Sequence, residues 1–553
     1  KLNQFRPKNN SSSMYLRGMK YMLLLFIHLL SQLVFAQGYL TKIKYPNGQI
    51  QSIGKFNLAG KEDSIWNYYY ENGALQELAN YTNGYLNGSV IRYHMNGNIQ
   101  TKGFFKYGVQ DSIFITYNES SKVIETGQYQ EGIEIGIWKY FNEEGSVKKE
   151  IEFTADGMRL LTFRDSKGSI TITNGLGELI EYHESGTLKS KTPYVNGIAH
   201  GIFESYYSNK LIESRGEFKN GVKEGAWIAY FLDGKVRTST TYTNGIVTGP
   251  YEEYFNSEKL YVKGDFVDGK KTGKWNWYRE NGQPDMEGTF EDDLQEGDWT
   301  YYHSNGTWQS KGKFSKGKMT GKWDYQYPSG KKWKTGNFVN DQKEGEWVNW
   351  YENGQILQKG NYKNGEEDGK WMAWYENGKL KDQGSFKQGK MYGKWEGFEP
   401  KNGLKLYSGS WNSDLKVGKW INYDERGRIE SLITYNKNGE LHGRQVLMNE
   451  NNIKMSDGNF KNGKRDGKWE YYYDFGGLWR VCSYKEGKLN GHSVTYSENG
   501  AIEEDANYKD NKYHGVCTFY DKKTRQLIEK GVFENGKMVK FLEGTPGASR
   551  KKS

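Results

Sequence analysis

The chain has 553 residues and a net charge of +9 at pH 7, with 69 glycines, 18 tryptophans and 43 tyrosines but only two cysteines. Residues 1–36 hold five basic and no acidic residues, and residues 541–553 hold three basic and one acidic, so subtracting +5 and +2 leaves +2 for the rest. A nearly neutral body excludes binding to a nucleic-acid phosphate backbone, which needs concentrated lysine and arginine.

The first 36 residues resemble an export signal. Because the chain starts at Lys1 and not at methionine, we expect residues 1–13 to be a non-native or untranslated extension. Residues 14–36 combine a positive start, an apolar run and small residues before Gln37, the pattern of a signal peptide. The apolar run is shorter than the roughly 20 residues of a bilayer span, and an uncleaved anchor is the alternative. We expect an exported protein that is periplasmic, on the cell surface or secreted.

From residue 177 to residue 540 the chain repeats itself regularly. A glycine recurs every 24 or 25 residues, at Gly201, Gly225, Gly249, Gly273, Gly297, Gly321, Gly345, Gly369, Gly393, Gly418, Gly443, Gly467, Gly491 and Gly515. Such a period indicates one small unit stacked many times, since no copy can bury its apolar face alone. Residues 37–176 are expected to be degenerate repeats, and residues 151–177 a worn repeat or an inserted hairpin. Residues 541–553 are expected to be a basic, flexible tail.

Each repeat is expected to be one β-hairpin. The clearest copy, from Gly360 to Gly378, reads G-x-[FY]-x2-G-x3-G-x-W-x2-[YW]-x3-G. Its aromatic runs are short and bounded by Gly, Asn and Asp, which favours strands. Asn377-Gly378 predicts a tight turn with positive φ, and the Lys-x-Gly-x-x-x-Gly segment predicts a looser return turn where a ring lies on bare glycine backbone. The fold class is therefore all-β, an elongated solenoid of about twenty stacked antiparallel hairpins.

The residues that define the repeat are a glycine and the tryptophan two positions later. In five consecutive copies these are Gly273 and Trp275, Gly297 and Trp299, Gly321 and Trp323, Gly345 and Trp347, and Gly369 and Trp371. A second aromatic residue commonly follows five positions after the glycine. Strand alternation places the two rings on opposite faces, so either both faces carry aromatic rows or a bulge returns both rings to one side.

The Tyr-x-Asn-Gly, Gly-x-Tyr/Phe-x-x-Gly and Gly-Lys-Trp elements resemble the bacterial variant of MORN repeats over about residues 40 to 540. His200, His442 and His514 each precede the repeat glycine, as in many MORN repeats, whereas most copies here have Asp, Glu or Thr there. The resemblance implies a non-catalytic scaffold for protein or membrane contacts. Bacterial members are often labelled YwqK-type antitoxins.

No catalytic, cofactor-binding or metal-binding residues are expected. The three histidines that precede a repeat glycine share one slot in different repeats, which indicates a turn-stabilising role, and no cysteine or histidine stands at metal-ligand spacing. Paired carboxylates such as Asp292-Asp293 are expected in or beside turns, and a continuous sheet offers no evident pocket for a small-molecule substrate. Cys482 and Cys517 are expected to lie three strands, about 14 Å, apart and to be unpaired.

The remaining candidate is a surface. Trp277, Tyr301 and Tyr325 stand four residues after the repeat glycine, and Trp333 and Trp479 stand twelve after it, where other copies have small or polar residues. Such rings either pack locally or are exposed and bind proteins or sugars. We expect an exported, non-enzymatic scaffold that binds a protein partner. The alternatives are a glycan, cell-envelope or membrane-surface binder and, less compatible with export, an antitoxin-like partner of a toxin.

Overall fold

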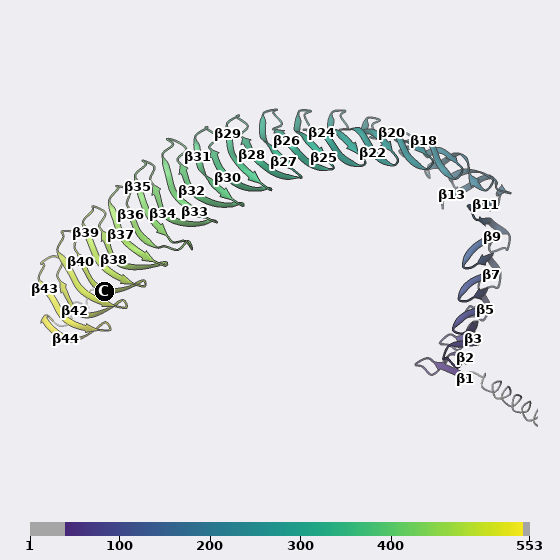
Figure 1. The fold of residues 1–553 in the computed structure, drawn as a ribbon, viewed down its shortest axis with the longest axis horizontal. Helices are drawn as coiled ribbons and strands as arrows, with labels where there is room; N and C mark the ends of the chain where they lie inside the picture. The colour runs from purple at the N-terminus through teal and green to yellow at the C-terminus, as the bar shows by residue number, and fades with distance from the viewer. Residues whose placement is uncertain (1–38, 546–553) are drawn as a thin grey trace, which may run out of the picture. The chain divides into compact units, whose positions relative to one another are not determined.

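The computed structural model describes residues 39–545, which form 44 β-strands and no helix, in an antiparallel sheet (Figure 1). The predicted all-β fold of hairpins is confirmed. Within these residues there is accordingly no helix long and apolar enough to cross a membrane. The segments expected to be an extension and a signal peptide, residues 1–13 and 14–36, lie outside the described residues. The last strand continues to Gly544, so it includes the first residues of the expected tail.

The chain divides into two compact units, Lys1–Glu258 and Lys259–Ser553. The strands of the first unit are β1 (Tyr39–Lys44), β2 (Ile50–Phe56), β3 (Glu62–Tyr69), β4 (Leu75–Thr82), β5 (Tyr85–Tyr93), β6 (Ile99–Lys106), β7 (Val109–Tyr117), β8 (Val123–Gln130), β9 (Ile133–Phe141), β10 (Val147–Thr154), β11 (Gly157–Arg164), β12 (Ile170–Thr173), β13 (Leu176–Tyr182), β14 (Leu188–Val195), β15 (Ile198–Ala199), β16 (Gly201–Tyr206), β17 (Ile212–Lys219), β18 (Val222–Tyr230), β19 (Val236–Thr243) and β20 (Ile246–Tyr254).

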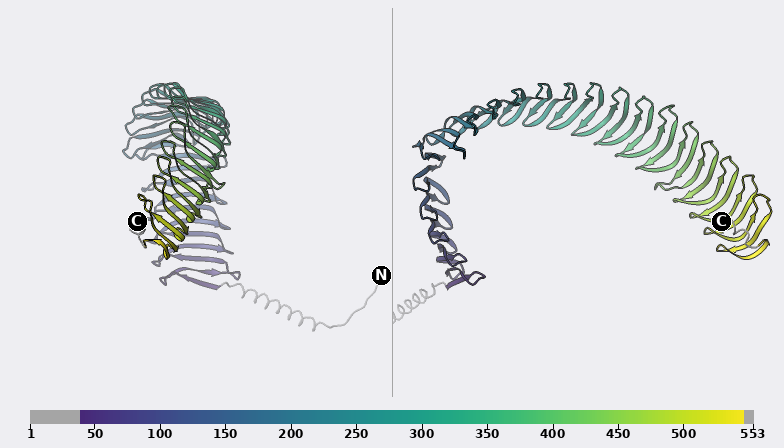
Figure 2. Two further views of the ribbon diagram at one scale, coloured as in Figure 1. Left: turned by 90° about the vertical axis from the view of Figure 1, so that its left-hand side faces the viewer. Right: turned by 180° about the vertical axis from the view of Figure 1, so that it is seen from behind.

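The strands of the second unit are β21 (Leu260–Val267), β22 (Lys270–Tyr278), β23 (Pro284–Glu291), β24 (Leu294–Tyr302), β25 (Trp308–Ser315), β26 (Lys318–Gln326), β27 (Lys332–Val339), β28 (Gln342–Trp350), β29 (Ile356–Lys363), β30 (Glu366–Trp374), β31 (Leu380–Lys387), β32 (Lys390–Phe398), β33 (Lys405–Asn412), β34 (Leu415–Tyr423), β35 (Ile429–Tyr435), β36 (Gly443–Met448), β37 (Lys454–Lys461), β38 (Lys464–Tyr472), β39 (Leu478–Lys485), β40 (Lys488–Tyr496), β41 (Ile502–Lys509), β42 (Lys512–Tyr520), β43 (Leu527–Glu534) and β44 (Lys537–Gly544). Figure 2 shows from two further sides that these hairpins follow one another in chain order.

The tight turn and the looser turn of each repeat are exchanged relative to the prediction. After β30, the Tyr375 N–H donates to Lys379 O and the Gly378 N–H donates to Tyr375 O, and in this turn Gly378 has a positive φ whereas Asn377 does not. The return turn is the tight one, because Lys363 pairs with Glu366 and both intervening residues have positive φ. Asn377 serves its turn through its side chain, which accepts from the Lys379 N–H at 3.0 Å.

The hairpin turns of successive repeats are joined along one edge. The Tyr375 hydroxyl donates to Phe398 O at 2.9 Å, one repeat further on. The same contact to the carbonyl 23 residues on is made by Tyr70, His94, His183, Tyr207, His303, Tyr327, Tyr351 and Tyr473. Each repeat therefore orients the turn of the next one.

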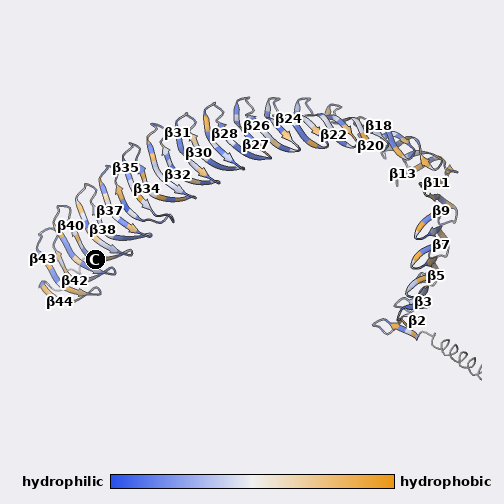
Figure 3. Cartoon of the chain, viewed as in Figure 1, coloured by the Kyte–Doolittle hydropathy of each residue, from blue (hydrophilic) through white to orange (hydrophobic). Residues whose placement is uncertain are grey.

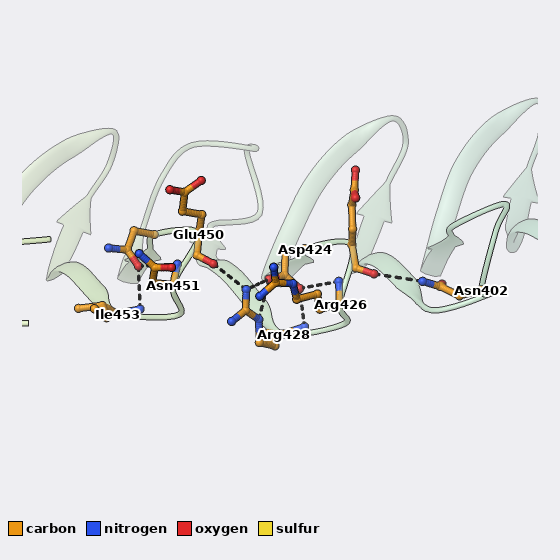
Figure 4. Close-up of polar contacts among 9 residues, drawn as sticks. Asn402, Asp424, Arg426, Arg428, Glu450, Asn451 and Ile453 are labelled. Carbon is orange, nitrogen blue, oxygen red and sulfur yellow. Dashed lines mark hydrogen bonds and ion pairs between the residues drawn. The ribbon is translucent and has the colours of Figure 1, made fainter. Parts of the chain in front are cut away.

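Figure 4 shows this ladder at the turns that follow β32, β34 and β36. Asn402 Nδ2 donates to Glu425 O at 3.1 Å. In the next turn Arg428 is held by the Asp424 carboxylate, with Nε 2.8 Å from Oδ2, and its guanidinium donates to Glu450 O at 2.7 Å. Arginine thus takes over the link to the turn carbonyl that asparagine makes elsewhere.

The return turns form a second ladder at the other edge. The Gly365 N–H donates to Lys343 O, 22 residues earlier, at 3.0 Å. In one of the copies where aspartate replaces that glycine, the Asp341 N–H donates to Met319 O and Asp341 Oδ1 accepts from the Met319 N–H at 2.7 Å. Asp341 has a φ of 68°, so the extra hydrogen bond offsets the strain of a left-handed backbone.

Aromatic rings lie on both faces of the sheet. Trp299 and Tyr301, two residues apart, have ring centroids 6.1 Å apart and share a face. The Tyr302 hydroxyl donates instead to Glu287, whose carboxylate also pairs with Lys274 on the opposite face. The first alternative, aromatic rows on both faces, is therefore correct. We call the face with the repeat tryptophans the tryptophan face and the other the polar face; Figure 3 shows this mixture of hydrophobic and hydrophilic residues along the strands.

The core is a row of indoles lying on glycines. Trp323 is 1% exposed; it pairs with Gly336 on one neighbouring strand, and its indole lies over Gly312 on the other. It contacts Phe314 edge-on at 5.3 Å and Phe338 at 6.3 Å, and its indole N–H donates to Lys313 O at 3.2 Å. A single-layer sheet buries tryptophan in this way because the bare glycine lets the ring lie flat and neighbouring rings cover its edges.

Residues 151–177 continue the alternation of antiparallel hairpin strands. β10 pairs with β11, β11 with β12 and β12 with β13, so the strand order of the repeat continues through this segment. β12 has only four residues, however, whereas β10 and β14 have eight. The segment keeps the hairpin alternation but shortens one strand.

Candidate interaction surface

The histidines belong to the turns. His200 Nδ1 and His442 Nδ1 accept the backbone N–H of Asn220 and Asn462, each at 3.4 Å. Their predicted turn-stabilising role is confirmed; a glutamate fills the same slot in other copies. His514 differs, since its Nδ1 is buried with no hydrogen-bond partner among residues 39–545.

The described part of the chain contains no group of three or more His, Cys, Asp or Glu side chains that could hold a metal ion. His94, His183 and His303 occupy the turn position that tyrosine fills elsewhere, and their Nε2 atoms bond to carbonyls of the next repeat at 2.8–2.9 Å. In other repeats a tyrosine at this position bonds to the carbonyl oxygen 23 residues later. That recurrence of tyrosine or histidine was visible in the sequence, but sequence reasoning missed it. The histidines therefore act as structural hydrogen-bonding groups.

The two cysteines are free and fully buried. Cys482 stands opposite Ser493, and Cys517 stands opposite Ala506. In regular repeats the first position of each pair is a glycine and the second is a tryptophan. Cys482 and Ala506 therefore stand in the glycine position, and Ser493 and Cys517 stand in the tryptophan position. Burial raises the pKa of both thiols above the ordinary value. The prediction that the cysteines are unpaired is confirmed.

Three of the five candidate surface rings pack locally. Trp277, Tyr301 and Tyr325 are partly buried against the core row of Trp299, Phe314, Trp323, Phe338 and Trp347. Trp277 lies 6.0 Å from Trp299 between ring centroids, and burial is the main cause that raises the pKa of Tyr325 to about 12. These rings extend the core toward the hairpin-turn edge of the tryptophan face.

Trp333 is 37% exposed and stands at a β-bulge of β27, where Tyr325 pairs with Lys334 and Gln326 pairs with Lys332. Its ring is 6.0 Å from Tyr325, edge-on, and 6.1 Å from Tyr327. Lys334 Nζ lies 4.3 Å from the Tyr325 centroid and 4.4 Å from that of Trp333, and burial lowers the pKa of this lysine. The bulge therefore presents one open indole beside a cation.

Trp479 is 41% exposed and occupies the same bulge position in β39. It contacts Tyr471 at 6.0 Å and Tyr473 at 6.5 Å. Phe475 adds a ring that sequence reasoning missed: it stacks on Tyr473 at 5.4 Å and 5° and is 59% exposed. The available signal was a phenylalanine at the turn position that Asn377 holds in the regular copy. We call Trp333, Trp479 and Phe475, with the tyrosines beneath them, the exposed ring clusters.

In the second unit the polar face carries many charge pairs. Glu396 is the most enclosed example, 2.8 Å from both Lys394 and Lys405, and it also accepts from Gln383 at 2.8 Å. The hydrogen bonds from the two lysines lower the pKa of Glu396 to about 2. Paired charges satisfied within the sheet favour solubility, so the exposed ring clusters are the stronger candidates for contact.

One comparison with known proteins identifies the repeat. The MORN repeat variant family matches residues 62–83, 134–155, 176–196, 271–292, 343–364, 367–388, 465–486 and 489–510. No curated protein matches the chain.

Similar solved structures include the TcdB2–TccC3–Cdc42 complex, at 11% identity and a TM-score of 0.11 over 91% of this chain and 30% of that one. A Photorhabdus luminescens Tc holotoxin pore matches at 11% identity and a TM-score of 0.12 over 92% of this chain and 32% of that one. The chain spans about a third of the length of these structures, and TM-scores this low support no argument from them. The eight matched segments and the hairpin that each repeat forms place the chain in the MORN repeat variant family.

Proposed function

We propose that the chain is a non-catalytic scaffold that binds a protein partner through the tryptophan face of its second unit. The observation that carries this proposal is the shared position of Trp333 and Trp479. Both stand at the same bulge of the repeat, both remain more than one-third exposed, and each is supported by two tyrosines.

Rigid aromatic side chains are well suited to anchor a protein interface. Trp and Tyr bury large areas at little entropic cost and are enriched among residues that dominate binding energy. Here the supporting tyrosines are themselves fixed, because the Tyr327 and Tyr473 hydroxyls donate to Trp350 O and Tyr496 O at 2.8 and 2.7 Å. Two anchors on one scaffold add their weak contacts through avidity when a partner spans both.

The test is affinity capture with the full chain against a Trp333→Ala/Trp479→Ala variant. A matched control is Trp308→Ala/Trp350→Ala, which also removes two tryptophans but on the polar face. A protein captured by the parent and the control, and lost with the first variant, is expected. That protein, once purified, should bind the parent chain directly and the first variant at least tenfold more weakly. Equal capture by both variants would contradict the proposed face.

Glycan binding is a second candidate, and the parallel stack of Tyr473 and exposed Phe475 favours it, since flat aromatic surfaces also stack against sugar rings. It predicts saturable binding of envelope polysaccharide that is lost in Phe475→Ala. Export through residues 14–36 is a further proposal, checked by fractionating the producing cells and locating the chain.

A further inference from the structure

A groove of about 450 Å³ opens in the first unit, where the repeat is irregular. Its lining includes Lys149, Ile151, Met158, Leu160, Leu179 and Tyr194. Ile151 pairs with Trp138 on one side and with Leu160 on the other, and residues paired directly across antiparallel strands share a face. The groove therefore belongs to the tryptophan face.

The groove exists because the regular glycine and tryptophan pair is replaced here. Gly360 stands opposite Trp371 in a regular copy, whereas Ile151 stands opposite Leu160 at the equivalent strand position. The sequence has no tryptophan between Trp138 and Trp227. Leucine fills less space than an indole, so part of the surface that a ring covers elsewhere stays open. Met158, at the rim, is 69% exposed.

The groove also has a cation at its side. Lys149 Nζ lies 4.1 Å from the centroid of the Tyr140 ring. Neighbouring Glu150 is already paired with Lys139 at 2.9 Å, and within residues 39–545 no carboxylate forms an ion pair with Lys149. An acidic group arriving with an aromatic ring would meet an ammonium that has no anionic partner among the residues that the structure describes.

We propose that this groove receives an aromatic side chain of a protein partner, with an adjacent acidic residue of that partner facing Lys149. The proposal rests on the proposed scaffold function. Shape and charge support this occupant: the opening lies where every regular repeat lays its own indole, most of its lining is apolar, and its one cation, Lys149, is open to a carboxylate. Aromatic anchors in well-packed apolar pockets are the common centre of protein interfaces.

The probe is the peptide Ac-Asp-Trp-Asp-NH2 in which the tryptophan is 5-fluorotryptophan. Its binding to the full chain is measured by fluorine NMR. Ile151→Gly/Leu160→Trp restores the regular pair and fills the groove with the chain's own indole, so peptide binding should be lost. Ala506→Gly/Cys517→Trp makes the same repair in the second unit and should leave binding unchanged. If the first variant does not fold, Leu179→Phe narrows the groove without changing Ile151 and provides the same comparison.

Lys149→Ala should weaken the acidic peptide about fivefold and leave Ac-Gly-Trp-Gly-NH2 unchanged. Binding that persists in the filled variant, or no saturable binding to the parent chain, would overturn the proposal. If 5-fluoroindole-3-acetate binds as tightly as the acidic peptide, the site takes a free small molecule and the assigned occupant is wrong. The peptide assay uses only the purified chain and does not depend on capture through Trp333 and Trp479. Failure of the groove proposal and failure of the proposed function can therefore be distinguished.

Discussion

Gly312 lies so close beneath the indole of Trp323 that a Cβ built on the glycine would stand 2.2 Å from Cδ2 of the ring. The same closeness recurs between Gly264 and Trp275 and between Gly409 and Trp420. Where the glycine slot carries a side chain, the residue eleven positions later, whose ring would lie over it, is no longer tryptophan: Ala79 pairs with Val90, Cys482 with Ser493 and Ala506 with Cys517. The two positions therefore behave as one packing unit.

Gly312→Ala is expected to destabilise the second unit by about 1–3 kcal/mol, because the new methyl group overpacks a filled site. Trp323→Val alone should also destabilise it, by leaving a cavity. The double variant should recover part of the loss, since it recreates the pairing of Ala79 with Val90. Urea unfolding of all four proteins gives the coupling energy; strictly additive losses would show that the two residues do not act together.

Asp341→Ala is expected to destabilise the chain more than Asp341→Gly. Both changes remove the 2.7 Å hydrogen bond to the Met319 N–H, but only alanine must adopt a φ of 68° with a Cβ. The difference should be about 1 kcal/mol in the free energy of unfolding. A smaller loss for alanine than for glycine would contradict the observed turn geometry.

Glu396 should make stability depend on pH in acid. Its folded-state pKa of about 2 lies below the ordinary value of 4.5, so the folded state binds its proton less readily than the unfolded state. The stabilisation is complete above about pH 4.5 and is lost as pH falls towards 2. Unfolding midpoints of Glu396→Gln should vary less over this window than those of the parent. Asp298→Asn, at an exposed carboxylate of the same unit, controls for the change in net charge.

Cys482 and Cys517 should react slowly with a thiol reagent at pH 8 in the folded chain. Both are 0% exposed, and burial raises the pKa of each thiol, which lowers the thiolate fraction. Denaturant should release two reactive thiols per chain, and prior reduction should not change that count. Rapid labelling of either cysteine in the folded state would contradict the packing described for the two slots.

Much of the fold follows from local chemistry. The glycine period, the short aromatic runs and the Asn-Gly pairs require a chain of hairpins, because each feature acts within a few residues. The free cysteines follow from strand spacing, and the histidine slot follows from the period. The candidate ring positions are also visible in the sequence, as departures from what other repeats place there.

Only the tertiary structure decides how those rings are used. Trp277 and Trp333 both depart from the repeat consensus, yet Trp277 packs on Trp299 whereas the bulge of β27 leaves Trp333 open. The side of the sheet on which a ring lies depends on which strand carries the extra residue of a bulge. The groove beside Leu160 depends likewise on strand pairing that joins Ile151 to its neighbours. These features depend on packing between neighbouring strands. The order of residues along one strand does not determine that packing.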